Sequence, residues 1–536
     1  MRVRLQDKLR KKDDKTLWDE YCGFLDLDIQ QYMYIQKRLF AEQIRLWSRS
    51  GLGRLLLGGA EPKTVEEFRS VMPLTTYDDY AETLLRKRAD MLPDEPLVWI
   101  QTTWEGGLRP IKLAPYKRSM LDVYKHNIIA VMILASSRKK YDVNIASGDT
   151  VLYGGAPLPY ATGLMPSLLD EDISLTWLPD NNEHSKLSFS ERIKKGFEIA
   201  FCRGIDYFFA IGSVANYITE SFGKKGGGKG RKLKIAPRYA FRYLRAKYIC
   251  KRDGRAMQPK DIFRIKGFVS AGTDAKCYKK KLGDAWGVMP IEIAAGTEST
   301  CIGAETWEQN GMVFFPDACF YEFIPEAEML KNIENPAYTP KTCLADEVVK
   351  DCNYELVISV FKGGAFARYR IGDVYRCVSD SVGGCVPRFT FVDRVPQVID
   401  IAGFTRITEA SVENVVALSK LGIGDWFARK EFTANNCPFL HLYLEMDETA
   451  MLSEAISKSV FAEHLTVYFK HCDSDYEDLK KLLEIDPLQI TILKSGTVKK
   501  YERQSGMSLP RINPSDIDVI SLLRMHGNVS GREVKR

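Results

Sequence analysis

One stretch of the chain combines a carboxylate with residue types that can bind a small polar molecule. Ala365 to Cys377 is AFARYRIGDVYRC, and it places Asp373 after Tyr-Arg-Ile-Gly, between two β-rich runs. An ionised carboxylate can accept hydrogen bonds from two adjacent hydroxyl groups, such as those of a ribose. An exposed position on a strand edge would explain Asp373 without any ligand. The other motifs of the chain must therefore show whether Asp373 belongs to a binding site.

A second stretch could bind an anion. Trp99 to Pro115, WIQTTWEGGLRPIKLAP, leads a strand into a turn rich in Thr and Gly, followed by Lys112. Hydroxyls and backbone N–H groups in such a turn can surround an anion, and a lysine supplies a point charge suited to phosphate. The run is not GxxxxGK[ST], so it is not a P-loop. An ordinary surface turn is the alternative.

Two further stretches add a hydroxyl–carboxylate pair and an arginine. Pro290 to Thr300, PIEIAAGTEST, is a β-type apolar run followed by Thr297 and Glu298. The Thr297 hydroxyl can hold a phosphate oxygen. Glu298 can bind Mg²⁺, because this ion prefers one or two carboxylates plus substrate phosphates. The alternative for both residues is a capped turn. In the fourth stretch, FTFVDRVPQVIDIAGFTRI, Arg394 could neutralise a phosphate or hold a ribose. A surface ion pair would explain it equally well.

The order of apolar patterns predicts an α/β scaffold for these residues. Helical spacing of apolar residues predicts two helices between Thr16 and Trp47. Strands then alternate with helical stretches from about Leu97 to Glu220, which is typical of α/β layers. A strand-rich part follows from Phe263 to Arg394, and a separate α+β domain begins beyond it.

A basic segment interrupts this pattern. Gly223 to Lys234, GKKGGGKGRKLK, predicts a mobile surface loop because its glycines lie among lysines. Lysine and arginine outnumber acids throughout Gly223 to Arg255. We expect a solvated loop leading into a helix with an exposed basic face. The alternative is a docking surface for an acidic macromolecule, such as an acyl carrier protein or a nucleic acid.

Composition excludes several classes of protein. With 45% hydrophobic and 27% charged residues the chain has an ordinary globular composition. A chain of 536 residues is longer than one domain with a single hydrophobic core, so we expect more than one domain. The longest apolar run, Ile128 to Ala135, is too short to span a bilayer and predicts a buried helix. The cysteines lack CxxC spacing and the histidines lack HExxH spacing, so we expect reduced thiols in a cytoplasmic protein and no zinc site. A net charge of +6 gives no reason to expect a nucleic-acid partner.

The four stretches together resemble a known family. A Thr/Gly turn with lysine, a strand ending in TE, Y-R-x-G-D, and D-R with G-F-x-R-I follow the motif order of adenylate-forming enzymes. More narrowly, the chain resembles the auxin-responsive-promoter family of acyl-acid amido synthetases, especially its bacterial branch. The runs LWDEYCGFLDL, PLTTYDDYAETLLRKRADMLPDEPLVWIQTT and GGAPLPYATG also resemble that branch. The resemblance extends from about residue 16 to residue 510.

The resemblance implies a large N-terminal adenylation domain, 1–396, of several sheets flanked by helices, and a small mobile α+β domain, 397–536. It also implies ATP and Mg²⁺ as cofactors. The residues that match the family's phosphate loop are Thr102, Thr103, Gly106 and Gly107, with Lys112 as the trailing lysine. Those that match its other nucleotide contacts are Thr297, Glu298 (also the magnesium ligand), Tyr369, Asp373 (on the ribose), Arg394 (before the hinge) and Gly272, in the turn SAGTDA beside the adenine.

The chain departs from the family pattern at two places. Trp104 and Glu105 occupy the centre of the phosphate loop, which is usually rich in hydroxyls, and a negative charge there is unfavourable beside a triphosphate unless it points away. Near the C-terminus Ser508 stands where the family often has lysine. Lys499, in SGTVKKYER, is the best substitute, because S-G-x-x-K is similar to the SGK of other adenylate-forming enzymes; a solvated surface lysine is the alternative.

The function that this resemblance implies is ATP-dependent amide synthesis by an acyl-adenylate-forming ligase. A carboxylic acid is activated as acyl-adenylate and then transferred to an amine or amino acid, with release of AMP. Tyr160, Thr162, Gly163 and Leu164 are expected to border the acyl pocket, although a buried connector would also fit. The alternatives are a non-catalytic or repurposed family member and an acyl-CoA or carrier-protein ligase. We expect small-molecule partners, with an acidic carrier protein as a further candidate and no membrane partner.

Overall fold

The chain forms two compact units. The computed structural model describes residues 3–102, 111–180, 189–225, 237–401, 405–434, 437–446, 454–465 and 486–528. The first unit contains residues 1–102 and 112–393, and the second contains residues 394–536. The predicted domains, 1–396 and 397–536, and the mobility of the second stay predictions.

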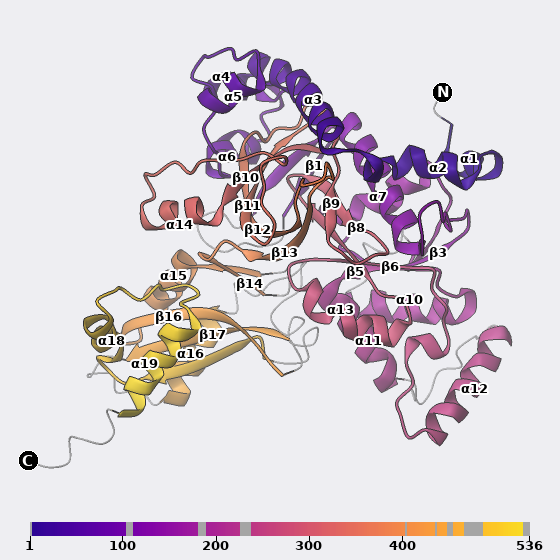
Figure 1. Cartoon of the computed structure of the whole chain (residues 1–536). Helices are drawn as coiled ribbons and strands as arrows, with labels where there is room; N and C mark the ends of the chain where they lie inside the picture. Colours follow the sequence, from indigo (N-terminus) through magenta and orange to yellow (C-terminus); the bar gives the residue numbers. More distant parts are fainter. Residues whose placement is uncertain are drawn as a thin grey trace, which may run out of the picture. The chain divides into compact units, whose positions relative to one another are not determined.

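An eleven-stranded sheet forms the centre of the first unit, in the order β10-β11-β12-β13-β9-β8-β7-β6-β5-β3-β4 (Figure 1). Strands β4, β3, β5, β6 and β7 run parallel, as the alternation of strands and helices predicts. From β7 onward the pairs β7–β8 and β8–β9 are antiparallel, as are β10–β11 and β11–β12. The strands are β3 (Thr150–Gly154), β4 (Thr176–Leu178), β5 (Tyr207–Ile211), β6 (Gly267–Ala271), β7 (Ile291–Gly296), β8 (Thr300–Glu305), β9 (Met312–Phe314), β10 (Cys319–Pro325), β11 (Asn353–Val360), β12 (Tyr369–Ser379) and β13 (Arg388–Arg394).

Helices cover this sheet, and a separate antiparallel pair, β1 (Val98–Gln101) and β2 (Leu113–Tyr116), lies between α6 and α7 in the chain. The helices are α1 (Leu5–Lys11), α2 (Asp14–Tyr21), α3 (Ile29–Arg49), α4 (Gly51–Leu56), α5 (Val65–Val71), α6 (Asp78–Leu85), α7 (Arg118–Ser136), α8 (Met165–Asp170), α10 (Phe189–Arg203), α11 (Gly212–Lys225), α12 (Pro237–Arg252), α13 (Ala275–Trp286) and α14 (Glu326–Glu334). Short 3-10 turns are η1 (Gly23–Asp26), η2 (Ala89–Met91), η3 (Ala161–Leu164) and η4 (Pro259–Asp261).

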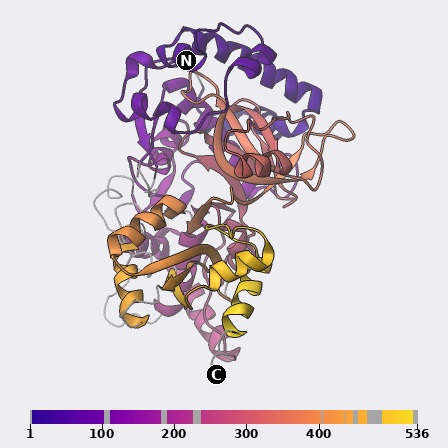
Figure 2. The same cartoon turned by 90° about the vertical axis from the view of Figure 1, so that its left-hand side faces the viewer.

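The two helices predicted between residues 16 and 47 are confirmed as α2 and α3. A capping box starts α3, because the Asp28 carboxylate accepts from the Gln31 backbone at 2.7 Å and the Gln31 side chain accepts from the Asp28 backbone at 3.1 Å. Gln36, buried on the inner face of α3, donates to the carbonyls of Pro316 and Cys319, 2.6 and 2.7 Å away. Figure 2 shows this N-terminal helical layer, in indigo, against the strand-rich half of the sheet.

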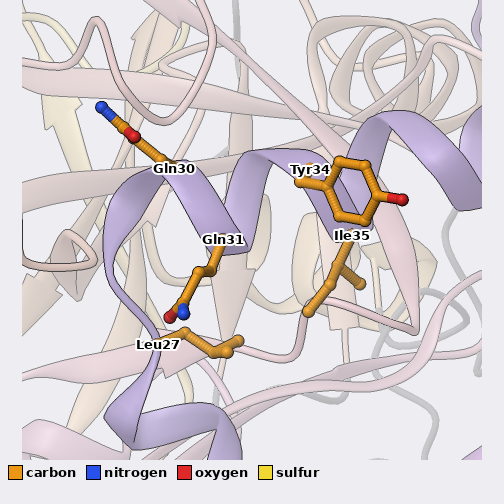
Figure 3. Close-up of a pocket in the computed structure, with 5 residues that line it drawn as sticks. All are labelled: Leu27, Gln30, Gln31, Tyr34 and Ile35. Carbon is orange, nitrogen blue, oxygen red and sulfur yellow. The ribbon is translucent and has the colours of Figure 1, made fainter.

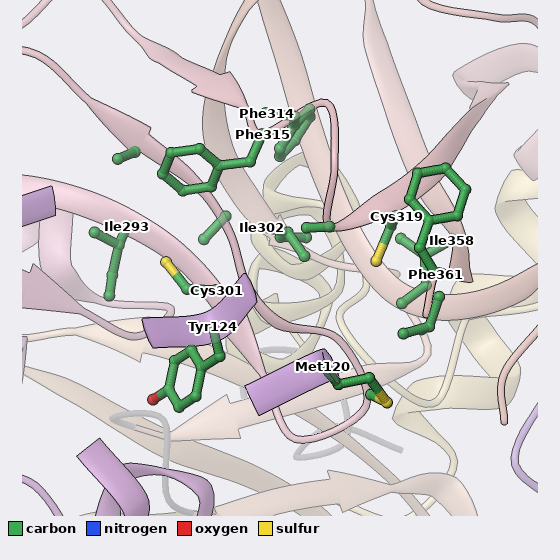
Figure 4. Close-up of a cluster of buried hydrophobic side chains, with 14 of the residues drawn as sticks. Met120, Tyr124, Ile293, Cys301, Ile302, Phe314, Phe315, Cys319, Ile358 and Phe361 are labelled. Carbon is green, nitrogen blue, oxygen red and sulfur yellow. The ribbon is translucent and has the colours of Figure 1, made fainter. Parts of the chain in front are cut away.

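The core of the first unit is formed where α7 meets the sheet. The predicted buried helix from Ile128 to Ala135 is confirmed, since it forms the second half of α7 and every one of its residues is buried. Aromatic, aliphatic and thiol side chains pack there, among them Met120, Tyr124, Cys301, Phe314 and Phe361 (Figure 4). All the cysteines that the structure describes are free, and among the described helices none has the length and apolarity that a membrane crossing needs.

The second unit has the α+β composition that the sequence predicts. A hairpin of β14 (Val398–Ile401) and β15 (Thr405–Thr408) precedes a three-stranded sheet of β16 (Ile423–Phe432), β17 (Pro438–Met446) and β18 (Leu488–Leu493). Its helices are α15 (Glu409–Ser419), α16 (Glu454–Leu465), α18 (Thr497–Ser505) and α19 (Asp516–Asn528). One small core joins Phe427 and Tyr443 of the sheet to Val498 and Tyr501 of α18 and Leu522 of α19.

Candidate active site

The turn between β7 and β8 holds the predicted Thr297–Glu298 pair. Glu298 is buried, with 7% of its surface exposed, and its Oε1 accepts a hydrogen bond of 3.0 Å from the Tyr369 hydroxyl. The Thr297 carbonyl accepts a second bond, of 2.5 Å, from the Tyr116 hydroxyl. Residues far apart in the sequence are therefore brought together, and two buried phenols fix both members of the TE pair.

Tyr369 is a donor whose proton is firmly held. It is 1% exposed, and burial raises its pKa well above its usual value, with the neighbouring Glu298 charge adding to the effect. The phenol therefore stays protonated and donates to the carboxylate at any ordinary pH. The structure gives Tyr369 a positioning contact with Glu298; its predicted contact with a nucleotide stays a prediction.

The strand that carries Tyr369 is locked on both edges. The Thr75 backbone donates to the Arg368 carbonyl at 2.9 Å and accepts from the Arg370 backbone at 2.9 Å, while β11 pairs with the other edge. Arg368 itself donates to the buried Glu322 with two bonds of 3.0 Å. The arginine of the Y-R-I-G-D motif has a structural partner, since Arg370 forms two 2.7 Å bonds with Glu355.

A bulge in β12 sets the position of Asp373. Arg370 pairs with Val357 and Val374 pairs with Glu355, so three residues of β12 oppose one residue of β11. Gly372 lies in this bulge with φ of 81°, a conformation that glycine adopts at low cost. Bulges redirect side chains next to active sites. The Ile-Gly-Asp part of the motif therefore takes Asp373, which is half-buried, out of the regular ladder.

The β1–β2 hairpin positions Thr102 and Lys112 opposite each other. The Thr102 backbone donates to the Lys112 carbonyl at 2.9 Å, and the Lys112 backbone donates to the Thr102 hydroxyl at 3.1 Å. The Lys112 ammonium lies 5.6 Å from the centre of the Tyr77 ring, within reach of a cation–π contact. The other predicted loop residues (Thr103, Gly106 and Gly107) and the two departures (Trp104 and Glu105) lie outside the described residues.

The predicted acyl-pocket segment lies beside this hairpin. The Gln101 backbone donates to the Pro159 carbonyl at 3.0 Å, and Gln101 bridges to Tyr160 in parallel fashion. The Thr162 hydroxyl holds the two ends of the loop 156–162 together. It accepts a hydrogen bond from the Ala156 backbone N–H at 3.0 Å and donates one to the Ala156 carbonyl at 2.9 Å.

Two other members of this segment are placed by packing. A Cβ at Gly163 would lie 2.2 Å from the Leu158 nitrogen, so only glycine fits there. Leu164, like Tyr160, is 9% exposed. Contact of these residues with an acyl group stays a prediction.

The parallel strands explain why these groups share one edge. The Tyr160 segment follows β3, Gly272 follows β6, and Thr297 with Glu298 follows β7, so all lie beyond carboxyl ends of parallel strands. In open α/β sheets ligands bind at this edge. Gly272 has φ of 100°, and a Cβ on it would lie 2.9 Å from Ile211 at the end of β5. Its predicted contact with adenine stays a prediction.

The remaining candidates belong to the second unit. The Arg394 Nε lies 3.6 Å from Asp400, a carboxylate that is 1% exposed and that Arg406 also approaches to 3.6 Å. Burial lowers the pKa of Arg406 to about 10, which still leaves it charged at neutral pH. Two guanidinium groups therefore share one buried carboxylate at the start of this unit.

Lys499 is exposed in the first turn of α18. The buried Glu445 accepts from the backbones of Gly496 and Val498 at 2.7 and 2.8 Å, which fixes the turn that precedes it. A role for Lys499 in catalysis stays a prediction.

Sequence reasoning missed Tyr116, Asp400 and Arg406. Tyr116 belongs to no motif, and nothing in its sequence neighbourhood indicates a partner at Thr297. Arg406 lies within the quoted run GFTRI, so the pairing with Arg394 could have been suspected from the motif, whereas Asp400 looks like one strand residue among several.

A surface pocket of about 450 Å³ lies away from these residues. It is lined by Leu27, Gln30, Gln31, Tyr34 and Ile35, all at or near the start of α3 (Figure 3). None of the predicted site residues lines it.

Comparison with solved structures defines the class of fold. The acyl acid amido synthetase AtGH3.15 in complex with 2,4-DB has 16% sequence identity and a TM-score of 0.53, with 96% of this chain and 97% of that chain covered. A second GH3.15 acyl acid amido synthetase structure has 13% identity and a TM-score of 0.50, with 92% and 93% covered. A 2-hydroxyisobutyryl-CoA ligase in complex with 2-HIB-AMP and CoA has 14% identity and a TM-score of 0.55, with 89% and 92% covered. The chain therefore has the two-part fold of adenylate-forming ligases.

A family model then defines a narrower relationship. Residues 312–394, from β9 to the end of β13, match the GH3 family central domain, and this segment contains Tyr369, Asp373 and Arg394. The predicted resemblance to the acyl-acid amido synthetase family is thus confirmed for this segment. A search of curated proteins finds no match to the chain. The bacterial branch stays a prediction.

Proposed function

We propose that this protein is an ATP-dependent acyl-acid amido synthetase. The observation that carries the proposal is the hydrogen bond between Tyr369 and Glu298, since it joins the TE turn to the Y-R-I-G-D strand, and that strand belongs to the segment that matches the GH3 family central domain. The bridge between Gln101 and Tyr160 and the hydrogen bond from Tyr116 to Thr297 also support the proposal, since they link the β1–β2 hairpin to this edge of the sheet. The similar solved structures support this proposal because two of those reported above are acyl acid amido synthetases.

The nucleotide contacts follow from the chemistry of each group. Asp373, displaced from its ladder by the Gly372 bulge, accepts from the two ribose hydroxyls. Thr102 and Lys112, paired across the hairpin, supply a hydroxyl and a charge for phosphate oxygens. Arg394, which lies 3.6 Å from the buried Asp400, is proposed to supply a further charge for the nucleotide.

The residues of the TE turn fit a magnesium ion. Within the described ranges no group of three or more His, Cys, Asp or Glu side chains is positioned to hold a metal. Mg²⁺ that is bound with nucleotide needs only one or two carboxylates, because phosphates and waters complete its shell. Glu298 supplies one carboxylate and Tyr369 fixes its orientation. The ion, when bound, would neutralise charge on the phosphates.

The proposed reaction has two steps. A carboxylate oxygen of the acid attacks the α-phosphorus of ATP, and the bond to pyrophosphate breaks. The nitrogen of an amine or amino acid then attacks the acyl carbon, AMP leaves, and the nitrogen loses a proton. The protein forms no covalent bond, so its contribution is positioning and charge neutralisation. The second unit, with Lys499, is proposed to change position between the steps.

The test separates the two steps. Purified protein with ATP, Mg²⁺ and a panel of carboxylic acids should release pyrophosphate only with its own acid. Addition of a panel of amino acids and amines should then accelerate AMP release, and mass spectrometry should detect an amide. If no acid in the panel supports pyrophosphate release while ATP still binds, a non-catalytic nucleotide-binding role replaces the synthetase.

A thioester-forming ligase is the second candidate. The observation in its favour is the TM-score of 0.55 to the 2-hydroxyisobutyryl-CoA ligase, which is slightly above the scores of 0.53 and 0.50 to the amido synthetases. The same assay with coenzyme A, or with a phosphopantetheinylated carrier protein, decides between them. If the thiol alone accelerates AMP release and yields a thioester, the protein is a ligase of that kind.

A further inference from the structure

Helix α12 exposes an apolar stripe. Phe241, Leu244 and Tyr248 are 69%, 64% and 71% exposed, which are high values for large apolar side chains. Their spacing of three and four residues places them on one side of the helix, because an α-helix has 3.6 residues per turn. Single exposed apolar residues are ordinary, whereas a contiguous apolar patch with polar residues around it is typical of a site that binds a protein, a membrane or a ligand.

Basic side chains border this stripe on both sides. At about 100° per residue, Arg245 and Arg252 lie along one side of the stripe, and Lys247 and Lys251 lie along the other. All four are exposed, and α12 contains no acidic residue. Arg252 has one acidic neighbour, Asp253, at 2.8 Å just beyond the helix. The stripe is therefore an apolar strip between two rows of cations.

The opposite face of α12 is fixed to the protein, so the stripe cannot turn inward. The Tyr239 hydroxyl donates to the Arg203 carbonyl at 3.4 Å, and Arg242 donates to the Ile262 carbonyl at 3.3 Å. The Tyr239 and Phe263 rings pack 5.9 Å apart. Ala246 and Cys250, on the same inner face, are 4% and 5% exposed. These contacts orient the stripe outward without any ligand.

We propose that the exposed face of α12 binds an anionic lipid surface. A helix with apolar side chains on one strip and Lys and Arg beside it lies in the interface of a bilayer, with its apolar side chains among the lipids and its cations at the headgroups. The three stripe side chains are exposed on one side of a single helix, so they can enter a flat surface together. The longest apolar run, Ile128 to Ala135, is too short to span a bilayer, which is why the sequence predicts no membrane partner. A helix that lies on the membrane surface does not need a spanning segment.

The charge pattern argues against two other occupants. A second copy of the chain would bring two rows of cations against each other, which is unfavourable. A nucleic acid would suit the charges and could stack bases on Phe241 and Tyr248, but the central position of the stripe, Leu244, offers no aromatic face for stacking. An acidic protein with an apolar groove shares the required chemistry and is distinguished by the test below.

The position of α12 in the sheet topology supports a role in attachment. Its partners Arg203 and Ile262 precede β5 and β6, so the helix lies at the amino ends of these parallel strands, whereas the candidate active site lies beyond the carboxyl ends. Figure 1 shows α12 at the outer margin of the first unit. Attachment through this helix therefore leaves the edge of the sheet with Gly272 and Glu298 open to substrates.

The test uses the full-length protein without nucleotide, so its result does not depend on the proposed activity. Vesicles of phosphatidylcholine with one third phosphatidylglycerol should co-sediment the protein at low salt, and vesicles of phosphatidylcholine alone should not. Added salt should weaken the binding, because cations provide much of the attraction. Equal binding to both kinds of vesicle, or binding to neither, overturns the proposal.

Two variants locate the binding surface. A stripe variant (F241S, L244S, Y248S) and a charge variant (R245Q, K247Q, K251Q, R252Q) should each weaken binding at least about ten-fold, since one surface cation alone contributes roughly five-fold. The control variant removes exposed apolar side chains from the second unit instead (M507S, I517S, I520S), where exposure is 63%, 78% and 50%, and should bind like the unmodified protein.

Circular dichroism checks that all the variants are folded, which is expected because the changed side chains face solvent. Loss of binding in the control variant, or none in the stripe variant, contradicts the assignment. Apo acyl carrier protein serves as a soluble acidic probe. If it binds through the stripe while anionic vesicles do not, the partner is an acidic protein and the lipid proposal is wrong.

Discussion

Replacing Tyr369 with phenylalanine tests whether the TE turn is held by a hydrogen bond from the Y-R-I-G-D strand. The change removes one hydroxyl and keeps the ring, and the ring is fully packed. Glu298 then loses a 3.0 Å donor while it remains 93% buried. A hydrogen bond to a charged group contributes about 1.5–3 kcal/mol. Each 1.4 kcal/mol is a factor of ten, so the efficiency of pyrophosphate release should fall about ten- to a hundred-fold.

The assay follows pyrophosphate release against magnesium concentration, because a misplaced Glu298 should raise the magnesium requirement. Tyr321→Phe is the matched control. Tyr321 is also 1% exposed, but its hydroxyl donates to the Ile302 and Phe315 carbonyls at 3.1 and 2.8 Å, and neither acceptor is a member of the Thr297–Glu298 pair. The Tyr321→Phe variant should lose some thermal stability and keep the magnesium dependence of the unmodified protein. If Tyr369→Phe retains normal adenylation and magnesium dependence, Glu298 is not positioned by Tyr369 and the reasoning fails.

Other perturbations have equally definite outcomes. Asp373→Ala should weaken ATP binding at least about ten-fold, because it removes acceptors for two ribose hydroxyls; calorimetry on the folded variant measures it, and unchanged affinity would remove Asp373 from the site. Glu298→Gln should abolish pyrophosphate release at normal magnesium with little change in melting temperature, and persistent adenylation would leave Glu298 as a turn residue only. Alkaline pH should destabilise the first unit, because burial raises the pKa of several tyrosines well above 10. The free energy of unfolding that these neutral phenols contribute is complete below pH 10 and is lost as the pH rises beyond it. The midpoint of urea unfolding, measured from neutral to alkaline pH, should show this loss. These tyrosines are Tyr32, Tyr116, Tyr321 and Tyr369.

Much of the scaffold and the centre of the site could be predicted from the sequence. Apolar periodicity was sufficient for α2 and α3, since their inner faces repeat at the helical period. For α7 the signal was the continuous apolar run from Ile128 to Ala135. The TE pair was expected at a strand end and lies between β7 and β8. The prediction of a loop from Gly223 is wrong for Gly223 to Lys225, because these residues belong to α11. The rest of that expected loop, from Gly226, lies outside the described residues.

Other features depend on contacts that no local pattern contains. Tyr116 reaches Thr297 across many residues of chain, and only the folded sheet brings the two together. The bulge at Gly372 depends on the register of β11, which the sequence of β12 alone does not specify. The basic character of α12 was evident, but its apolar stripe was not, because burial of the opposite face decides which side is exposed.

The transfer of a carboxylate oxygen tests the central claim most directly. The protein is incubated with ATP, its acid labelled in both carboxylate oxygens with a heavy isotope, and an amine, and the AMP is examined by mass spectrometry. Attack of the carboxylate on the α-phosphorus predicts AMP that carries one heavy oxygen and an amide that carries the other. Unlabelled AMP, or heavy oxygen found in inorganic phosphate with ADP as the nucleotide product, would show that no acyl-adenylate forms and would contradict the proposed function.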